Sequence, residues 1–463
     1  MTGSNRLQGE EVSGYDILDA REQRAARQRH WLRLQEDCCL VSVTLNIAGP
    51  VKNTPLIRDG FWAGMELVDD TLTNLALPVL RREEWLLSTG CEAFRLVKGP
   101  ADEVKRAMIG VEASSRFGRL LDIDVLGPDG IPLSRTELGL PGRRCLVCGE
   151  PAQVCGRSQR HPYDQLRDVT NEIIHDFLSR RNADRVAALA CRAMLWEVLV
   201  TPKPGLVDRE NSGAHSDMDV FTFAASAAAI TPYLREAYLL GCRHSDRVRL
   251  LTALRGAGRL AEEEMNRATG HVNTHKGLIY SLGLLCAALG RCEESEQNSI
   301  SAWLEECGTL AAMTMDADFG AQVPSRATTG QTLYRTRGIG GIRAEAAAGF
   351  PSVQQIALPV LTRLLDGGMC ANEAGAYTLL ALLGRVTDTN MIARGGMETA
   401  VAAKEAALAL LPDLEGDLPD LTHLCTLDRQ FIRDNLSPGG CADLLAIAFF
   451  LYYLSKEKPT WQT

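Results

Sequence analysis

The chain has 463 residues, with 49 basic and 58 acidic side chains and a formal net charge of −9. This length is sufficient for two or three domains that each bury a core. The acidic balance excludes a general nucleic-acid binder, which would carry a strongly basic face. It leaves room for local basic pockets that hold phosphates.

The N-terminal segment and the cysteines indicate the compartment. Residues 1–16 are polar and lack the apolar core of a secretory signal, so we expect a cytoplasmic protein. The 14 cysteines are then expected to be thiols or metal ligands. The apolar run from Leu444 to Leu454 is shorter than the ~20 residues that cross a bilayer, which favours a core helix and no membrane association.

A strand pattern opens the first domain. Alternating β-branched residues begin at Cys39 and end near Pro55 in glycine and proline, which predicts a strand that runs into a loop. Lys52 in this loop is a candidate phosphate ligand. A solvated surface lysine is the alternative.

A second strand pattern carries two carboxylates. In GRLLDIDV, Asp122 and Asp124 interrupt an apolar run, and residues two apart on a strand project from the same face. Paired carboxylates suit Mg²⁺, which prefers oxygen ligands and bridges to phosphates. The alternative is a strand with its acidic face in water. Gly118 and Arg119 directly before the pair favour a phosphate pocket, so we expect an α+β, nucleotidyltransferase-like domain.

A cysteine-rich segment follows the carboxylates. Its candidate ligands, spaced C-x2-C-x6-C-x5-H, are Cys145, Cys148, Cys155 and His161. Three thiolates and an imidazole can close a tetrahedral zinc site. The spacing after the first pair is shorter than in common zinc fingers, so free thiols in a compact turn are the alternative.

Helical periodicity begins at Tyr163. Residues 163–181 and 184–200 predict two helices, and the polar sequence SRRNAD between them indicates a domain boundary. We therefore expect an N-terminal α+β domain over residues 1–182 and an all-helical domain over residues 183–463.

A charged loop from Thr201 to Asp219 lies between two apolar runs of the helical domain. Its prolines and glycines oppose a regular helix, and charged loops between buried helices often carry chemistry. Ser216 and Asp219 fit a capping box that would start the next helix. No capping role explains His215 and Asp217, so we expect both to face a ligand. Further candidates in the loop are Lys203, Asp208 and Arg209.

Polar groups also crowd the start of a later apolar helix. Asn273, His275 and Lys276 precede it, and a helix N-terminus offers free N–H groups and a partial positive charge that suit a triphosphate. For His275 alone, a cap or a core histidine is the alternative.

Further polar turns supply both signs of charge. Arg335 and Arg343 lie among glycines, where arginines can bind phosphate in a forked geometry; a mobile solvated loop is the alternative. Asp388 and Arg394 lie in another turn, and Asp443 lies just inside a helix that follows two glycines. Mixed charges that converge on one cleft are what a magnesium–nucleoside triphosphate requires.

These motifs resemble two known families. The part from Leu195 onward resembles the triphosphoribosyl-dephospho-CoA synthase family through TPKPGLVDRENSGAHSDMD, GHVNTHKG, TGQTLYRTRGIGGIRAEAAAGFP, DTNMIARGG and SPGGCADLLA. The part from about Arg21 to Leu166 resembles the citrate lyase holo-acyl-carrier-protein synthase family through TLNIAGPVK, GRLLDIDV and RRCLVCGEPAQVCGRSQRHP. The chain is thus similar to a fusion of the two. Ala48 stands where proline is expected and Cys441 where serine is expected; neither change removes a charged group.

The resemblance implies a bifunctional transferase. The C-terminal domain would join ATP to 3'-dephospho-CoA and release adenine. The N-terminal domain would transfer phosphoribosyl-dephospho-CoA to a serine of the citrate lyase acyl carrier (gamma) subunit and release pyrophosphate. A related malonate enzyme could use a similar carrier.

Candidate roles follow from this chemistry. Displacement at a ribose C1 passes through a cation-like state that needs a carboxylate, and both reactions need magnesium on the phosphates. The acidic candidates of the larger domain are Asp208, Asp217, Asp219 and Asp388, with Asp217 and Asp388 as magnesium ligands. The phosphate-binding candidates there are Lys203, Arg209, His215, Asn273, His275, Lys276, Arg335, Arg343 and Arg394. In the smaller domain Asp122 and Asp124 would hold magnesium, with Arg119 and Lys52 on phosphate.

Two alternatives differ in class. The helical domain could be a magnesium-dependent hydrolase of nucleotides or ADP-ribose, since acidic turns around a helical core also serve that chemistry. The cysteine-rich segment could be a zinc module that docks a partner protein.

Overall fold

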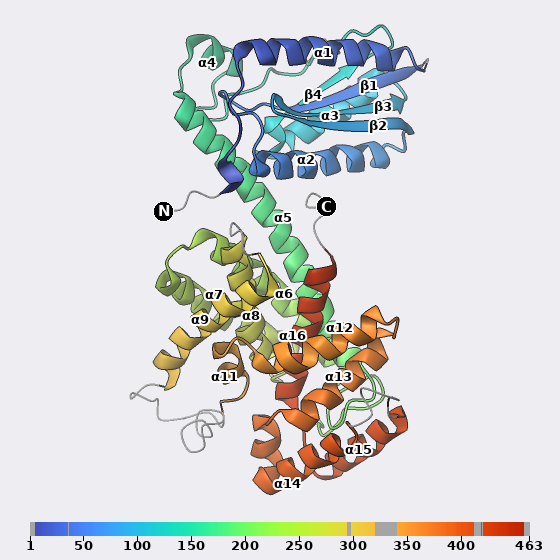
Figure 1. The fold of residues 1–463 in the computed structure, drawn as a ribbon, viewed down its shortest axis with the longest axis vertical. Coiled ribbons are helices and arrows are strands. Elements are labelled where there is room, and N and C mark those ends of the chain that lie inside the picture. Colours follow the sequence, from blue (N-terminus) through green and yellow to red (C-terminus); the bar gives the residue numbers. More distant parts are fainter. Residues whose placement is uncertain are drawn as a thin grey trace. The chain divides into compact units, whose positions relative to one another are not determined.

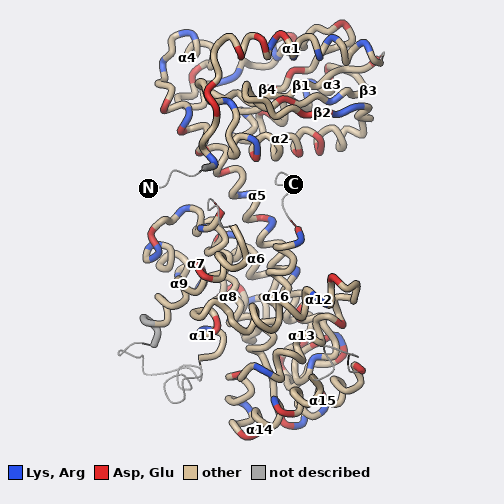
Figure 2. Tube along the Cα trace, viewed as in Figure 1, with Lys and Arg blue, Asp and Glu red and all other residues tan. Residues whose placement is uncertain are grey.

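The structure is a computed structural model that describes residues 5–35, 37–293, 298–319, 340–411, 418 and 420–457. The chain forms two compact units, one that ends at Arg181 and one that starts at Asn182 (Figure 1). Figure 2 shows basic and acidic residues interspersed in both units.

The first unit is built on a four-stranded sheet in the order β2-β3-β1-β4, and each neighbouring pair is antiparallel. Its strands are β1 (Cys38–Leu45), β2 (Val79–Leu87), β3 (Gly90–Lys98) and β4 (Leu121–Leu126). β1 and β4 correspond to the two strand patterns described above, and they lie side by side with Thr44 opposite Asp122 and Ser42 opposite Asp124.

Helices cover both faces of this sheet (Figure 1). On one face α2 (Pro55–Asn74) and α3 (Ala101–Ala113) bury Phe61 and Met108 against Val41 and Ile123. On the other face α1 (Gly14–Leu32) places Trp31 against Leu40 and Phe94. Short helices η1 (Asn5–Leu7), η2 (Gly118–Leu120) and α4 (Ala152–Ser158) complete the unit. This is an α+β arrangement; its nucleotidyltransferase-like character stays a prediction.

The helix after the cysteine-rich segment corrects the predicted break at SRRNAD. α5 runs without interruption from Tyr163 to Leu199. None of the six residues is a glycine or proline, so none breaks a helix. Arg180 is exposed and its guanidinium pairs with Asp176 one turn earlier, with 2.8 Å between Nε and Oδ2. The polar stretch is therefore partly the solvated side of a continuous helix.

The described residues of the second unit form helices that are joined by loops, and none of them lies in a strand. Its elements after α5 are α6 (Val220–Arg243), α7 (Arg247–Ala268), α8 (Lys276–Cys292), α9 (Ile300–Phe319), α11 (Gly341–Ala347), the π-helical turn η3 (Val353–Ala357), α12 (Leu358–Asp366), α13 (Ala371–Arg385), α14 (Thr389–Ala409, kinked at Gly396), α15 (Leu421–Arg433) and α16 (Gly439–Lys456). The most deeply buried helices are α8, α13 and α16.

α16 is longer than the apolar run Leu444–Leu454 suggests. Among the described helices it alone passes the length and composition test for a membrane span, but 61% of that window is buried inside the protein. Its residues Leu445, Ile447 and Phe450 have no exposed surface and belong to the main hydrophobic core. It is thus a central helix of this unit.

The start of α6 corrects the predicted capping box. Asp219 is the N-cap, and its carboxylate accepts the N–H of Thr222 at 2.8 Å while the Thr222 hydroxyl pairs back to the cap. The box therefore joins Asp219 to Thr222, and Ser216 lies before it. Asp219 occupies the first position of the motif because its backbone is already extended there.

Candidate active sites

A cavity of about 1310 Å³ opens in the helical unit. Its walls come from the loop 201–219, from α7, from the start of α8, and from the turns before α14 and α16. These segments are far apart in sequence, so the fold gathers polar turns that the sequence keeps separate.

Charges of both signs line this cavity. Its basic residues are Lys203, Arg255, Arg259, Lys276, Arg343 and Arg394. Its carboxylates are Glu197, Asp217, Glu262 and Asp443. Polar and neutral groups from His215, Asn273 and His275 lie between them.

The loop 201–219 is held in shape by a buried carboxylate. Asp208, 3% exposed, accepts the backbone N–H groups of Lys203, Glu210 and Asn211 at 2.8–3.1 Å. Gly205 adopts a positive φ of 70°, and a Cβ there would lie 2.2 Å from the carbonyl oxygen of Leu436. Asp208 thus shapes the cavity wall from behind and does not line the cavity.

A buried ion pair belongs to the cavity lining. Lys203 Nζ lies 2.5 Å from Glu197 Oε1, and both side chains are almost completely buried. Burial raises the pKa of Glu197, and the ammonium of Lys203 opposes that rise. Lys203 is therefore neutralised within the protein before any phosphate arrives.

His275 lines the cavity and carries a ring nitrogen without a hydrogen-bond partner. The Thr274 hydroxyl donates to Ser226 Oγ at 2.7 Å, and Ser226 Oγ pairs with His275 Nδ1, also at 2.7 Å. The tautomer in which the Ser226 hydroxyl donates to Nδ1 carries its ring proton on Nε2. That atom is buried and has no hydrogen-bond partner. Burial, and next the charge of Lys203, lower the pKa of His275 to about 3, so the ring is neutral at physiological pH.

His215 is fixed by its neighbours at another wall. Its Nε2 lies 2.8 Å from Ser437 Oγ, and Arg394 donates to its Nδ1 at 3.4 Å. The same guanidinium donates to the Asn435 side-chain oxygen at 2.7 Å and to the carbonyl oxygen of Ala214. Burial, and next the Arg394 charge, lower the pKa of His215. Asp217, whose side chain is 61% exposed, lies 3.9 Å from the His215 ring.

Asp443 approaches the first turn of α8. Its Oδ2 lies 2.0 Å from where a Cβ on Gly277 would stand, so only glycine permits this approach. Burial, and next repulsion from Glu197 and Asp388, raise the pKa of Asp443 well above its usual range. The cavity lining therefore contains a carboxyl group whose protonated form is favoured by burial.

Several predicted residues lie outside the cavity lining. Asp219 caps α6, as described above, and Arg209 is exposed, with its guanidinium 2.8 Å from the Asn372 side chain. Asp388 caps α14 with one oxygen and accepts the N–H of Cys441 with the other, so it joins the starts of α14 and α16. Arg335 falls outside the described residues.

The first unit carries the predicted pair of carboxylates on β4. Asp122 and Asp124 lie on the face opposite the buried Leu121, Ile123 and Val125, as their spacing predicts. Asp122 Oδ1 accepts from Arg143 at 3.0 Å. The side chain of Asp124 keeps solvent access, yet partial desolvation and then repulsion from Asp122 raise its pKa.

A buried glutamate links this pair to the cysteine-rich segment. Glu112 is 1% exposed at its side chain and accepts hydrogen bonds from Arg135 and Arg143. It also accepts the N–H of Ile123 at 3.0 Å, within β4. Arg143 therefore connects Glu112 and Asp122.

The two predicted cations of this unit lie near the junction of β1 and β4. The Asn46 N–H donates to the carbonyl of Leu120, directly after Arg119, at 2.7 Å. The ammonium of Lys52 donates to the carbonyl of Ile47, the residue after Asn46. Arg119 is partly exposed, whereas burial and then the charge of Arg21 lower the pKa of Lys52.

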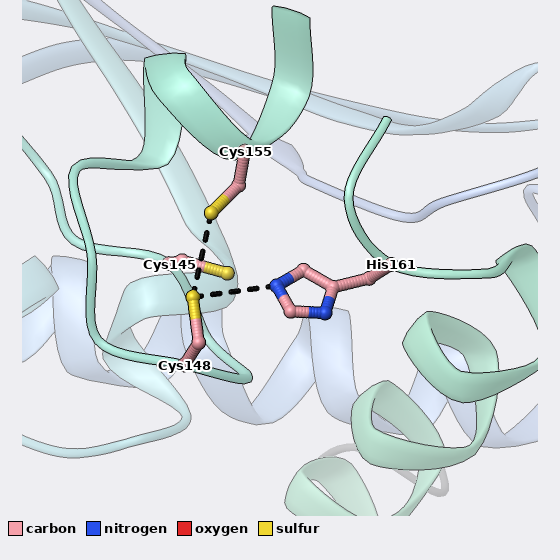
Figure 3. A group of neighbouring side chains, drawn as sticks. All are labelled: Cys145, Cys148, Cys155 and His161. Atoms are coloured by element: carbon pink, nitrogen blue, oxygen red, sulfur yellow. Dashed lines mark hydrogen bonds between the residues drawn. The ribbon is translucent and has the colours of Figure 1, made fainter. Parts of the chain in front are cut away.

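The four predicted zinc ligands lie together in the same unit (Figure 3). Cys148 Sγ is 3.4 Å from both Cys155 Sγ and His161 Nε2. The candidate ligand atoms of Cys145, Cys148, Cys155 and His161 all lie within 4.8 Å of one another.

Two family models match different parts of the chain. The model of the ATP:dephospho-CoA triphosphoribosyl transferase family, CitG, matches residues 183–461, and that of the apo-citrate lyase phosphoribosyl-dephospho-CoA transferase family, CitX, matches residues 12–177. Protein CitXG of Leuconostoc mesenteroides is 34% identical, covering 96% of this chain and 97% of the relative. Protein CitXG of Haemophilus influenzae is also 34% identical, with 96% of each covered. The chain belongs to the CitXG family.

A third relative covers the helical part. The 2-(5''-triphosphoribosyl)-3'-dephosphocoenzyme-A synthase of Pectobacterium atrosepticum is 39% identical over 62% of this chain and 95% of the relative. Family membership confirms the resemblance drawn from the sequence: the chain is a bifunctional transferase that makes and attaches the citrate lyase prosthetic group. These relatives give no support to a hydrolase.

The structure brings most of the predicted residues of the helical unit to one cavity. The predicted residues in its lining are Lys203, His215, Asp217, Asn273, His275, Lys276, Arg343 and Arg394. Sequence reasoning placed Asp443 just inside a helix without a role and missed Glu197, Arg255 and Arg259. A signal for Glu197 exists, because a lone carboxylate inside the apolar run MLWEVLV needs a partner when buried. Arg255 and Arg259 lie four apart and therefore share one face of α7.

Proposed function

We propose that the two units divide the two reactions between them. Residues 183–463 would make 2'-(5''-triphosphoribosyl)-3'-dephospho-CoA from ATP and 3'-dephospho-CoA, and residues 1–182 would attach it to the acyl carrier subunit of citrate lyase. The synthase reaction is assigned to residues 183–463 because six basic and four acidic side chains line one cavity there.

The size of the cavity suits two nucleotides. Single small-molecule sites usually measure ~300–1,000 Å³, and about 1310 Å³ is available here. In the proposed reaction the 2'-oxygen of dephospho-CoA forms a bond to C1 of the ATP ribose, and the bond from C1 to the adenine nitrogen breaks. The hydroxyl proton passes to a base, and adenine leaves with a proton from an acid. The triphosphate stays on the ribose throughout.

Basic residues from several elements would hold the triphosphate. Arg255 and Arg259 face the cavity from α7, and Lys276 faces it from the first turn of α8. Arg343 stacks over the Tyr280 ring at 4.5 Å, which restricts its guanidinium to the wall. The buried Nε2–H of His275 would donate to a phosphate or ribose oxygen. A neutral donor suits that position, because Lys203 already neutralises Glu197 and no second cation is needed beside this carboxylate.

Two carboxyl groups in different environments would handle the protons. Asp443, whose pKa is raised, would donate a proton to the departing adenine. Asp217, exposed at the cavity beside His215, would accept the hydroxyl proton or stabilise the cation-like ribose. Carboxyl pairs with contrasting environments divide acid and base work in the same way in glycoside hydrolysis. We do not assign the predicted catalytic roles of Asp208 and Asp219, because their carboxylates are used by backbone N–H groups.

Magnesium would spread the negative charge of the triphosphate when bound. Asp217 fits a ligand role, since its carboxylate faces the cavity and keeps solvent access. Asp388 does not fit, because both of its oxygens accept backbone N–H groups. We therefore keep Asp217 as the candidate ligand in this unit.

The transfer reaction would take place beside β4. A serine oxygen of the carrier forms a bond to the α-phosphorus, the bond to the bridging oxygen of pyrophosphate breaks, and the serine proton is released. Asp122 and Asp124 would hold magnesium here, since two mutually repelling carboxylates on one strand face are stabilised by a cation. Arg119 and Lys52 would contact the phosphates, and Arg143 would keep Asp122 in place.

We further propose that the protein works in the cytoplasm. All 14 cysteines lie in the described residues and none forms a disulfide, which is typical of proteins in a reducing compartment. ATP, 3'-dephospho-CoA and the acyl carrier are its proposed partners, without nucleic acid or membrane.

Mass spectrometry of a purified citrate lyase acyl carrier subunit tests the whole proposal. After incubation with this protein, ATP and 3'-dephospho-CoA, we expect a serine that carries phosphoribosyl-dephospho-CoA. Adenine release that requires dephospho-CoA supports transfer. Equal adenine or ADP-ribose turnover without dephospho-CoA would instead indicate a hydrolase and overturn the proposal.

A further inference from the structure

The segment from Pro128 to Pro162 has almost no core of its own. Among its residues, all of which the structure describes, the buried ones are Cys145 and Cys155, exposed 8% and 6%. Leu146 packs partly against the main core of this unit. The regular structure of the segment is the seven-residue helix α4 and single β-bridges such as that between Arg144 and Pro151. Segments with so little apolar burial usually need a cross-link or a metal to adopt one structure.

Both buried cysteines belong to the four-residue cluster of Figure 3. Four ligands around a tetrahedral zinc ion, at ~2.3 Å for sulfur and ~2.0 Å for nitrogen, stand roughly 3.5–3.8 Å from one another. The contacts of 3.4 Å and the outer limit of 4.8 Å in the cluster bracket this spacing. One ion at the centre would therefore need only small side-chain movements.

The backbone around the cluster also favours a metal. The Val147 N–H points at Cys145 Sγ, 3.5 Å away, and such donors stabilise the charge of a coordinated thiolate. Gly149, with φ 75°, closes the turn by donating its N–H to the carbonyl of Cys145 at 3.2 Å. α4 then presents Cys155, and the left-handed Gln159 ends that helix so that the chain returns with His161.

We infer that Cys145, Cys148, Cys155 and His161 bind one zinc ion that fixes the segment 128–162. A disulfide explains the cluster less well, because Cys148 Sγ and Cys155 Sγ are 3.4 Å apart, against ~2.05 Å in a bond, and because an imidazole would have no part in it. Thiolate and imidazole ligands in a tetrahedral set are those that select zinc.

The metal would act on the transfer site through Arg143, an inference that rests on the function proposed for this unit. Arg143 lies two residues before Cys145 and bonds both Glu112 and Asp122. Arg135, in the same segment, also bonds Glu112. Zinc would therefore position Arg143 against the carboxylate pair and take no part in the bond changes.

Metal analysis of the purified full-length chain tests the site. We expect one equivalent of zinc in the wild type and its loss in Cys148→Ser, whose side chain is exposed enough for the exchange to leave the core intact. Cys370→Ser is the matched control, since Cys370 is likewise exposed but starts α13 in the other unit. When cobalt replaces zinc, the wild type should show the visible absorption of a tetrahedral thiolate site. Cys148→Ser should not show it. Equal zinc in Cys148→Ser, a metal-free wild type, or a Cys148–Cys155 disulfide under non-reducing mass spectrometry would overturn the site.

Chelation of the same full-length protein tests the positioning role. After the chelator is removed and magnesium is restored, we expect new proteolytic cleavage within residues 128–162 and a loss of about tenfold or more in carrier modification, while adenine release is unchanged. If the protein contains zinc and its removal leaves carrier modification unchanged, the positioning role is wrong. A zinc-loaded protein that never modifies the carrier would instead overturn the proposed function and leave the metal site standing.

Discussion

Gly277→Ala tests the position of Asp443 without removing its charge. Gly277 lies in the first turn of α8, and Asp443 follows the first turn of α16. The added methyl group would stand 2.0 Å from Asp443 Oδ2 and 3.0 Å from its Cγ. A carbon and an unbonded oxygen rest roughly 3.3–3.6 Å apart, so the carboxyl group must retreat by more than about 1 Å. A catalytic group misplaced by ~1 Å typically costs about 10²-fold in rate.

The assay is adenine release at saturating ATP and 3'-dephospho-CoA. We expect kcat to fall about 10²-fold, and Asp443→Asn to fall at least as far. Thermal stability should not fall with it, because alanine favours a helix by ~1 kcal/mol over glycine and the Asp443 side chain can rotate away. Gly256→Ala is the matched control: Gly256 lies within α7 and its added methyl group would meet nothing within 4 Å.

A folded Gly277→Ala protein with the wild-type rate would refute this reasoning. It would mean that the location of the Asp443 carboxyl group does not matter to the departure of adenine. A rate loss shared by Gly256→Ala would point to a general effect on the helices and would also count against it.

Three further changes probe other parts of the two sites. Lys203→Met should lower the free energy of unfolding by about 3–5 kcal/mol, because it leaves Glu197 buried without its partner. Since burial raises the pKa of Glu197, the folded form takes up a proton, and the deficit in melting temperature should shrink as pH falls from about 8 to about 6. A wild-type melting temperature at the higher pH would contradict the argument. His275→Gln, which keeps a neutral donor, should retain a lower KM for ATP than His275→Ala, and equal constants would deny Nε2 a contact with substrate. Asp122→Asn should reduce carrier modification about 10²-fold with adenine release unchanged; full carrier modification would remove the carboxylate pair from the mechanism.

Local rules predicted the features that depend on a few neighbouring residues. The two-residue period of a strand placed Asp122 and Asp124 on one face of β4. The prolines and glycines between Thr201 and Asp219 predicted the loop that walls the cavity. The polar sequence after Leu178 gave the wrong local structure, because charged residues on the solvated side of a helix resemble a linker when read along the chain.

The acidic residues of the helical unit show where such rules end. A carboxylate in a turn can face a ligand or accept backbone N–H groups, and both uses place it beside a helix start. Asp208 and Asp388 accept three such N–H groups each, which only the folded chain reveals. Glu197 and Asp443 instead lie inside apolar helices, where an unpaired carboxylate is costly, and both line the cavity. In this unit an acidic residue within an apolar run is therefore a better guide to the cavity than one in a polar turn, because the fold has to compensate for burying it.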